Sequence, residues 1–220
     1  CMWLKGVVMK AHYNGLIPRN PFIQFHISPN VKEREYLTED ELKAVMTHEF
    51  ADSKLAYIRD IFIFASFTAL SFVDIQELTN DNIVEVNGEK WILSKRHKTK
   101  VAFQVKLLDI PLQIVERYRP MQKDNRIFPG LNYWSICKPL KRMIRECGIT
   151  KSISFHCSRH GFATLALSKG MPIESVSRVL GHTNIVTTQL YAKITTQKLD
   201  NDLTMFGDKL SKTFNGITMS

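Results

Sequence analysis

The chain has 220 residues, which exceeds the roughly 150 residues of a typical domain but is too short for two domains of that size. Hydrophobic residues make up 44% and charged residues 23%, which predicts a globular protein and excludes collagen-like, coiled-coil and disordered classes. The 30 Lys and Arg outnumber the 21 Asp and Glu, and the resulting charge of +9 favours a polyanionic partner, nucleic acid before an anionic membrane surface.

No transmembrane or secretory segment is expected. The longest uncharged, mostly apolar stretch covers residues 61–73, whereas a membrane-spanning helix needs about 20 residues. The first residues lack the features of a signal peptide, and we expect them to be an internal point of a longer protein. The four cysteines form no CxxC pair and have no histidine at zinc-ligand spacing, so the sequence predicts no disulfide scaffold, no metal site and a reducing cytoplasmic location.

The N-terminal part divides into a helix, a linker and the start of a second domain. Apolar residues in 2–16 have helical spacing, and three prolines in 17–34 disfavour both helix and sheet. Thr38 and Glu41 form a capping box that starts a new helix. We predict the end of a preceding domain at 1–28, a linker at 29–36, a compact domain at 37–205 and a tail at 206–220.

The compact domain is predicted to be mostly α with a small antiparallel β-sheet, an α+β fold. Residues 53–68 form a helix that is apolar on most sides and therefore central. Asn87-Gly88 is a hairpin turn between strands at 83–86 and 91–93, and a third strand follows at 101–107. The remaining expected helices cover 111–118, 131–147, 156–168, 172–180, a short segment that includes Tyr191, and a tail from 198.

Four polar residues in the C-terminal half have the chemistry for a reaction at phosphate. His156 and Arg159 are three positions apart, and thus neighbours at a helix start with free N–H groups. His182 follows a glycine that ends a helix, and Tyr191 comes nine positions later. Taken singly, such a His and Arg are more often solvated surface residues, and a helical Tyr is more often a packing residue.

The order and spacing of these four residues, with gaps of 3, 23 and 9 positions, resemble the tyrosine recombinases, the phage-integrase-like family. The resemblance runs from about residue 37 to 203 and extends to integrases of conjugative transposons. It includes the sequences Thr38-Glu39-Asp40-Glu41-Leu42, Arg159-His160-Gly161-Phe162-Ala163-Thr164 and Leu180-Gly181-His182-Thr183. It implies the DNA breaking–rejoining catalytic fold, with residues 1–28 as the end of a core-binding domain.

The resemblance also implies a role for each site residue. Tyr191 would attack the phosphorus and form a 3′-phosphotyrosine link, with His156 in acid/base duty. Arg159 would clamp the phosphate, His182 would donate a further hydrogen bond, and Lys98 in the hairpin would protonate the leaving 5′ oxygen. These roles need neither a metal nor a cofactor, because side-chain cations stabilise the charge on the phosphate.

One departure from the family pattern concerns charge. The family usually has an arginine in Thr-Gly-Leu-Arg, and this chain has Thr68-Ala69-Leu70-Ser71. Asp74 fits the family's acidic position in the same segment. Ser71 carries no charge, and we predict that Arg96, two positions before Lys98 and pointing to the same side, supplies the missing guanidinium. The alternative is that Arg96 is a solvated arginine in a basic turn.

The predicted function is site-specific DNA recombination, the integration or excision of a mobile element, on double-stranded DNA by a homo-oligomer, a tetramer. Three alternatives are a helix-turn-helix module at 173–194, a type IB topoisomerase, and a recombinase relative that binds DNA but cleaves weakly or not at all. A helix-turn-helix needs only about 60 residues and explains neither the hairpin nor Lys98. The tail has apolar residues at helical spacing, which suit packing on its own domain or on a neighbouring protomer.

Overall fold

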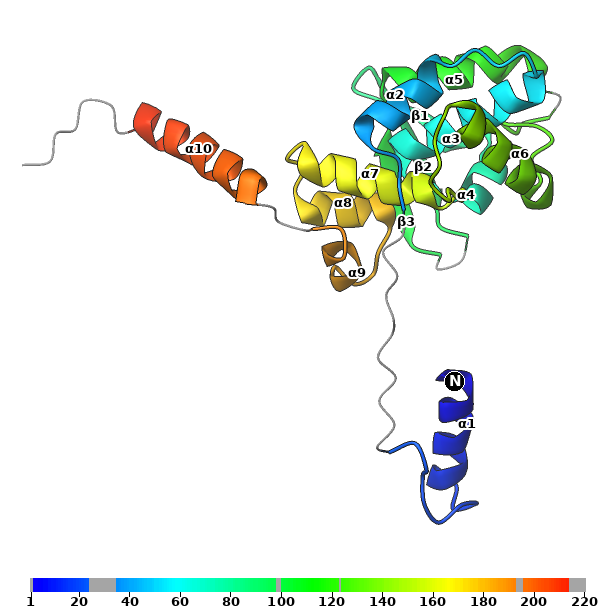
Figure 1. Ribbon diagram of the computed structural model, residues 1–220, viewed down its shortest axis with the longest axis vertical. Helices are drawn as coiled ribbons and strands as arrows, with labels where there is room; N and C mark the ends of the chain where they lie inside the picture. The colour runs from blue at the N-terminus through cyan, green and yellow to red at the C-terminus, as the bar shows by residue number, and fades with distance from the viewer. Residues whose placement is uncertain (1, 24–34, 98–99, 123, 193–195, 214–220) are drawn as a thin grey trace, which may run out of the picture. The chain divides into compact units, whose positions relative to one another are not determined.

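The computed structural model describes residues 2–23, 35–97, 100–122, 124–192 and 196–213, which form two compact units, 1–33 and 34–220. The first unit contains the predicted N-terminal helix as α1 (Met2–Tyr13) (Figure 1). Gly15, with φ of 71°, follows the helix in the left-handed region and ends it. The finer division into residues 1–28, 29–36, 37–205 and 206–220 stays a prediction.

Helix α3 (Ser53–Thr68) is the centre of the second unit, as its sequence predicts. Its buried residues lie on nearly every side, and α2 (Glu39–Thr47), α5 (Asp109–Tyr118), α6 (Tyr133–Glu146) and α7 (Cys157–Ser168) contact it. The predicted capping box at the start of α2 is confirmed, because Thr38 Oγ1 accepts from the Glu41 N–H and Glu41 Oε2 accepts from the Thr38 N–H.

The three predicted strands form one antiparallel sheet in the order β1 (Ile83–Val86), β2 (Glu89–Lys95) and β3 (Ala102–Lys106). Asn87 and Gly88 have φ of 53° and 77°, so this pair makes the predicted hairpin turn. Ser94 pairs with Phe103 near the other end of β2, and β3 contacts helix α8 (Ile173–Leu180). The sheet therefore brings the end of β2 toward the C-terminal helices.

A small apolar cluster holds the ends of α3, α7 and α8 together. Ala69, Ala163, Leu167, Val176 and Leu180 are all buried in it. Ala69 ends α3 in the left-handed conformation, and Gly181 does the same for α8. Because three helix termini meet here, polar backbone groups without helical partners gather at one place.

The remaining elements are short or lie near the C-terminus. Helix α4 (Phe72–Gln76) follows α3 directly, and single turns of 3₁₀ helix occur at Asn80–Asn82 and Arg119–Met121. Helix α9 (Val186–Gln189) is followed by α10 (Thr196–Thr213), which passes through the predicted boundary between 205 and 206. Within the described ranges, no helix combines the length and hydropathy that crossing a membrane requires.

Candidate active site

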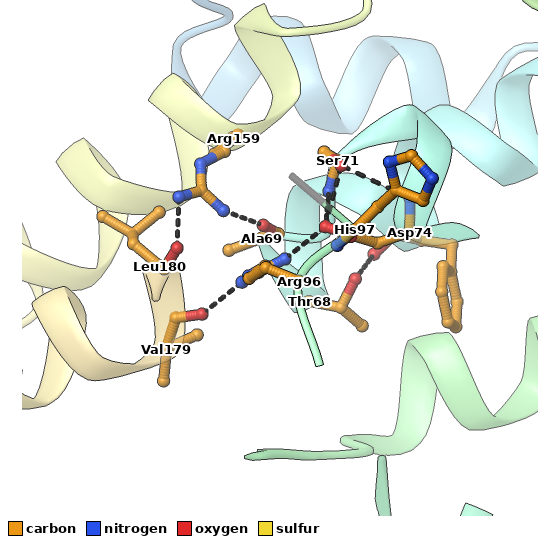
Figure 2. Close-up of polar contacts among 10 residues, drawn as sticks. Thr68, Ala69, Ser71, Asp74, Arg96, His97, Arg159, Val179 and Leu180 are labelled. Atoms are coloured by element: carbon orange, nitrogen blue, oxygen red, sulfur yellow. Dashed lines mark hydrogen bonds and ion pairs between the residues drawn. The ribbon is translucent and has the colours of Figure 1, made fainter. Parts of the chain in front are cut away.

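Arg159 connects the ends of three helices at the base of the site. It lies in the first turn of α7, it is buried, and its guanidinium donates to the carbonyl of Ala69 at 2.8 Å and to that of Leu180 (Figure 2). These carbonyls belong to the ends of α3 and α8, whose last C=O groups lack helical partners. His156 precedes α7 as its N-cap residue and is exposed, so the predicted His–Arg pair has one exposed and one buried member.

Ser71 is the residue that departs from the family pattern, and its hydroxyl is engaged in hydrogen bonds within the fold. It caps α4, where its Oγ accepts from the Asp74 N–H at 3.3 Å and donates to Asp74 Oδ2 at 2.7 Å. A hydroxyl has one proton to donate, and here that proton goes to Asp74. Ser71 therefore supplies the site with neither a charge nor a spare donor.

Arg96 follows the end of β2 and points into the protein. Its side chain is 7% exposed and its Nη1 lies 2.7 Å from Asp74 Oδ2, while Nη2 donates to the carbonyl of Val179 at 2.6 Å (Figure 2). Its guanidinium also lies 4.1 Å above the ring of Phe103. The alternative of a solvated surface arginine is wrong, because pairing with Asp74 holds Arg96 between the sheet and α8.

Gly181 makes room for Arg96. A Cβ at position 181 would lie 2.9 Å from Arg96 Nε, which is buried and has no hydrogen-bond partner among the residues that the structure describes. Gly181 also has φ of 62°, the left-handed conformation that glycine adopts without strain. Both the end of α8 and the place of Arg96 therefore require glycine.

The site holds more positive than negative charge. Burial, and after it the Arg96 cation, lower the pKa of Arg159 to about 10. Burial raises the pKa of Asp74, but the His97 N–H, the Arg96 guanidinium and the Ser71 hydroxyl outweigh it and keep that pKa below its ordinary value. Asp74 is thus a carboxylate shared by these donors, and Arg159 has no carboxylate partner in the described part of the chain.

His182 comes directly after Gly181 and is partly buried. Its Nδ1 lies 2.8 Å from the hydroxyl of Thr188 in α9. Burial, then the cations of Arg159 and Arg96 and after them His156, lower the pKa of His182 to about 4. The ring is therefore neutral at neutral pH, and it can donate a hydrogen bond without adding charge.

Tyr191 lies just after α9 rather than inside a helix, which corrects the sequence-based expectation. The chain tightens there to i→i+3 bonds, from the Tyr191 N–H to the Thr188 carbonyl and from the Ala192 N–H to the Gln189 carbonyl. The Tyr191 ring centroid is 5.2 Å from that of His160, which is 4.6 Å from that of His156. Tyr191 also packs against the apolar cluster of Ala69 and Leu180, whose carbonyls accept from Arg159, so the predicted nucleophile and phosphate clamp lie close together.

Lys98 lies outside the described residues, and its predicted role stays a prediction. The residue before it, His97, is described, and its backbone N–H donates to Asp74 Oδ1 at 3.0 Å. The chain thus leaves β2 with Arg96 and His97 both attached to Asp74. The structure brings together five of the seven predicted site residues, namely Ser71, Arg96, Arg159, His182 and Tyr191, with His156 one helical turn from Arg159.

The comparison with protein families decides the relationship. The model of the phage integrase family matches residues 35–198. The chain belongs to the phage integrase family. Among relatives of this integrase-family chain, the tyrosine recombinase XerA of Pyrococcus horikoshii is 32% identical over 177 residues, which cover 74% of the chain and 58% of that protein. The tyrosine recombinase XerD of Listeria innocua is 26% identical over 204 residues, which cover 85% of the chain and 67% of that protein.

Solved structures confirm the predicted fold. A structure of the Tn1549 transposon integrase in complex with a circular intermediate DNA has a TM-score of 0.77 with 18% identity, and the match covers 92% of this chain and 76% of that one. The mostly helical architecture with a three-stranded antiparallel sheet is therefore that of the tyrosine recombinase catalytic domains. The chain spans less than two thirds of the length of the Pyrococcus relative.

Two contacts of this integrase-family site escaped the sequence analysis. The partner of Asp74 is Arg96, 22 positions away, and the partner of His182 is Thr188. A threonine within a short helix carries no pattern that marks it as a histidine partner. No local pattern marks Arg96, 22 positions away, as the partner of Asp74. In the described ranges, no three His, Cys, Asp or Glu side chains are grouped as metal ligands would be.

Proposed function

We propose that this chain cleaves and rejoins double-stranded DNA at specific sites, as part of the integration or excision of a mobile element. The observation that carries the proposal is that the buried guanidinium groups of Arg96 and Arg159 both donate to carbonyls at the end of α8, which lies two residues before His182 and beside the apolar cluster against which Tyr191 packs. Of the two buried guanidinium groups only that of Arg96 is paired with a carboxylate, which leaves an uncompensated positive charge on Arg159 that a phosphodiester would neutralise.

The reaction is a transesterification in which each residue has one task. The Tyr191 oxygen forms a bond to phosphorus as the bond to the 5′ oxygen breaks, and His156 serves in acid/base duty for the phenol proton. Lys98 donates a proton to the leaving 5′ oxygen. Arg159 and the neutral His182 hold the non-bridging oxygens. The reverse reaction reseals the strand, so the energy of the phosphodiester is conserved in the protein–DNA link.

Arg96 takes the place of the charge that Ser71 lacks. Its buried guanidinium donates to the Val179 carbonyl, and that of Arg159 donates to the adjacent Leu180 carbonyl, so both charges lie at the end of α8. Asp74 holds Arg96 by a 2.7 Å ion pair and so orients it. The neutral Ser71 and the inward-pointing Arg96 together support an active enzyme in which the cation is supplied from position 96 instead of position 71.

The family relationship supports the same partners and location. The relatives from Pyrococcus horikoshii and Listeria innocua are named tyrosine recombinases, and the Tn1549 integrase structure contains a circular intermediate DNA. We propose that this chain acts on DNA as a homo-oligomer, a tetramer, in the cytoplasm, without a metal or a small-molecule cofactor. Cleavage is then expected to persist in excess chelator, and a strict requirement for magnesium would contradict this part of the proposal.

A relative that binds DNA without cutting it is the second candidate, because the Ser71 hydroxyl is committed to Asp74. Covalent trapping on nicked duplex DNA separates the two. The parent chain should form a protein–DNA adduct, and Tyr191→Phe, which removes only the hydroxyl, should bind the same DNA without forming one. A parent chain without adduct would favour the non-cleaving relative, and an adduct of normal yield from Tyr191→Phe would exclude Tyr191 as the nucleophile.

A further inference from the structure

Thr188 uses its hydroxyl differently from other helical threonines of this chain. Thr68 and Thr164 donate to the carbonyl four positions earlier, at 2.7 and 3.1 Å, as helical threonines commonly do. Thr188 is fully buried, and its Oγ1 instead lies 2.8 Å from Nδ1 of His182. Among the described residues, His182 is the only hydrogen-bond partner of the Thr188 hydroxyl.

The place of Thr188 is fixed by the turn that precedes it. Gly181 reverses the chain after α8, and Asn184 Oδ1 accepts from the Val186 N–H at 2.9 Å to start α9. The Thr188 N–H then donates to the Ile185 carbonyl at 2.8 Å. These contacts hold the hydroxyl against the His182 ring.

The direction of this hydrogen bond follows from where the hydroxyl proton can go. If His182 donated from Nδ1, the buried proton of Thr188 would have no acceptor in the described surroundings, and a buried polar group without a partner is costly. If Thr188 donates to Nδ1, both groups are satisfied. A neutral imidazole carries its proton on one nitrogen, so a lone pair at Nδ1 places the proton on Nε2.

We propose that Thr188 is a positioning residue whose hydroxyl donates to Nδ1 of His182 and thereby fixes the Nε2-protonated tautomer. That tautomer can donate to a phosphate oxygen, whereas the other would present a lone pair to it. The phosphate part of this inference rests on the proposed function. Because burial and the neighbouring cations lower the pKa of His182 to about 4, the ring has no second proton at neutral pH, and the tautomer decides whether it is a donor.

The first test measures the tautomer and does not depend on DNA cleavage. Nitrogen-15 NMR of histidine-labelled protein at neutral pH, with His182 assigned from a His182→Gln sample, should show a protonated Nε2 and a hydrogen-bonded, unprotonated Nδ1. Thr188→Val should move the Nδ1 signal to that of an unbonded lone pair, and Thr188→Ser should restore the parent signal. A proton on Nδ1 in the parent chain, or an Nδ1 signal unchanged in Thr188→Val, would overturn the proposal.

The second test measures single-turnover cleavage of nicked duplex DNA. Thr188→Val should cleave about tenfold to a hundredfold more slowly, the loss that removing a partner of a functional histidine produces at metal sites, with DNA affinity unchanged. Thr188→Ser should recover the rate, and Thr187→Val, at an exposed neighbouring threonine, should match the parent. In a His182→Ala background, Thr188→Val should cause no further loss, and a further loss there would contradict the proposal. If the parent forms no adduct, the proposed function fails while the NMR result still decides the role of Thr188.

Discussion

Two buried carboxylates in this protein have arginine partners, yet their surroundings differ. Asp60 in α3 is held by Arg59 at 2.8 Å, by Arg117 at 2.7 Å and by the Tyr118 hydroxyl at 2.7 Å. The Arg117 side chain is 56% exposed, so water solvates much of its charge. This cluster attaches α5 to α3 and leaves no positive charge buried without compensation.

The Asp74 cluster has the opposite balance. Its arginine, Arg96, is 7% exposed, and the buried Arg159 next to it has carbonyl partners only, within the part of the chain that the structure describes. Like charges held this close destabilise each other unless an anion joins them. The two clusters therefore differ in charge balance: at the proposed phosphate site, unlike at Asp60, the number of buried cations exceeds the number of buried carboxylates.

The largest expected difference between the clusters concerns stability. Asp74→Asn removes the carboxylate of a cation that cannot reach water, and the free energy of unfolding should fall by about 3–5 kcal/mol. Asp60→Asn should cost about 1–3 kcal/mol, because its outer arginine can turn to solvent. Urea denaturation of both variants measures the two free energies of unfolding. A lower free energy for Asp60→Asn than for Asp74→Asn would contradict the expected difference between the clusters.

Cleavage should respond to one cluster only. Arg96→Ala should slow cleavage of a nicked duplex by about one to two powers of ten, the worth of one charge-assisted contact to phosphate made in the transition state. Arg117→Ala should cleave at the parent rate. Ser71→Arg in the Arg96→Ala background should recover part of the loss. Rates are compared at a temperature at which each variant is folded, and equal rates for Arg96→Ala and the parent would show that Arg96 is structural.

A third expected effect is a pH dependence of stability. The folded protein lowers the pKa of His182 to about 4, below the ordinary value of about 6.5, so the unfolded chain binds more protons between these pH values. Stability should therefore fall as the pH drops from about 6.5 to 4. His182→Gln should lose less stability over that range. Identical slopes for parent and variant would mean that His182 is not held neutral.

Much of the fold follows from local patterns. The capping box at Thr38, the turn at Asn87 and the extent of α3 are set by neighbouring residues, and the structure confirms all three. The end of α9 depends on contacts outside the helix. Thr188 directs its hydroxyl to His182, and the chain changes to i→i+3 hydrogen bonds before Tyr191. A helical pattern of apolar residues predicts neither feature.

The sequence predicted which residues belong to the site better than it predicted the contacts among them. The order and spacing of Arg159, His182 and Tyr191, through the family resemblance that they carry, predicted these residues. The burial of Arg96 depends on Asp74 and Val179, 22 and 83 positions away, and on the absence of a side chain at position 181. Such contacts arise only when the sheet and α8 meet, so no local pattern could distinguish Arg96 from a solvated arginine.

The central claim is that the Arg96 charge acts on the phosphate that is cleaved. Replacing the scissile phosphodiester by a methylphosphonate removes one non-bridging negative charge and leaves the other contacts of the DNA in place. Single-turnover cleavage of both substrates is measured for the parent and for Arg96→Gln. Arg96→Gln should cleave the phosphodiester about one to two powers of ten more slowly than the parent, and this difference should largely disappear on the methylphosphonate. The same loss on both substrates would contradict it.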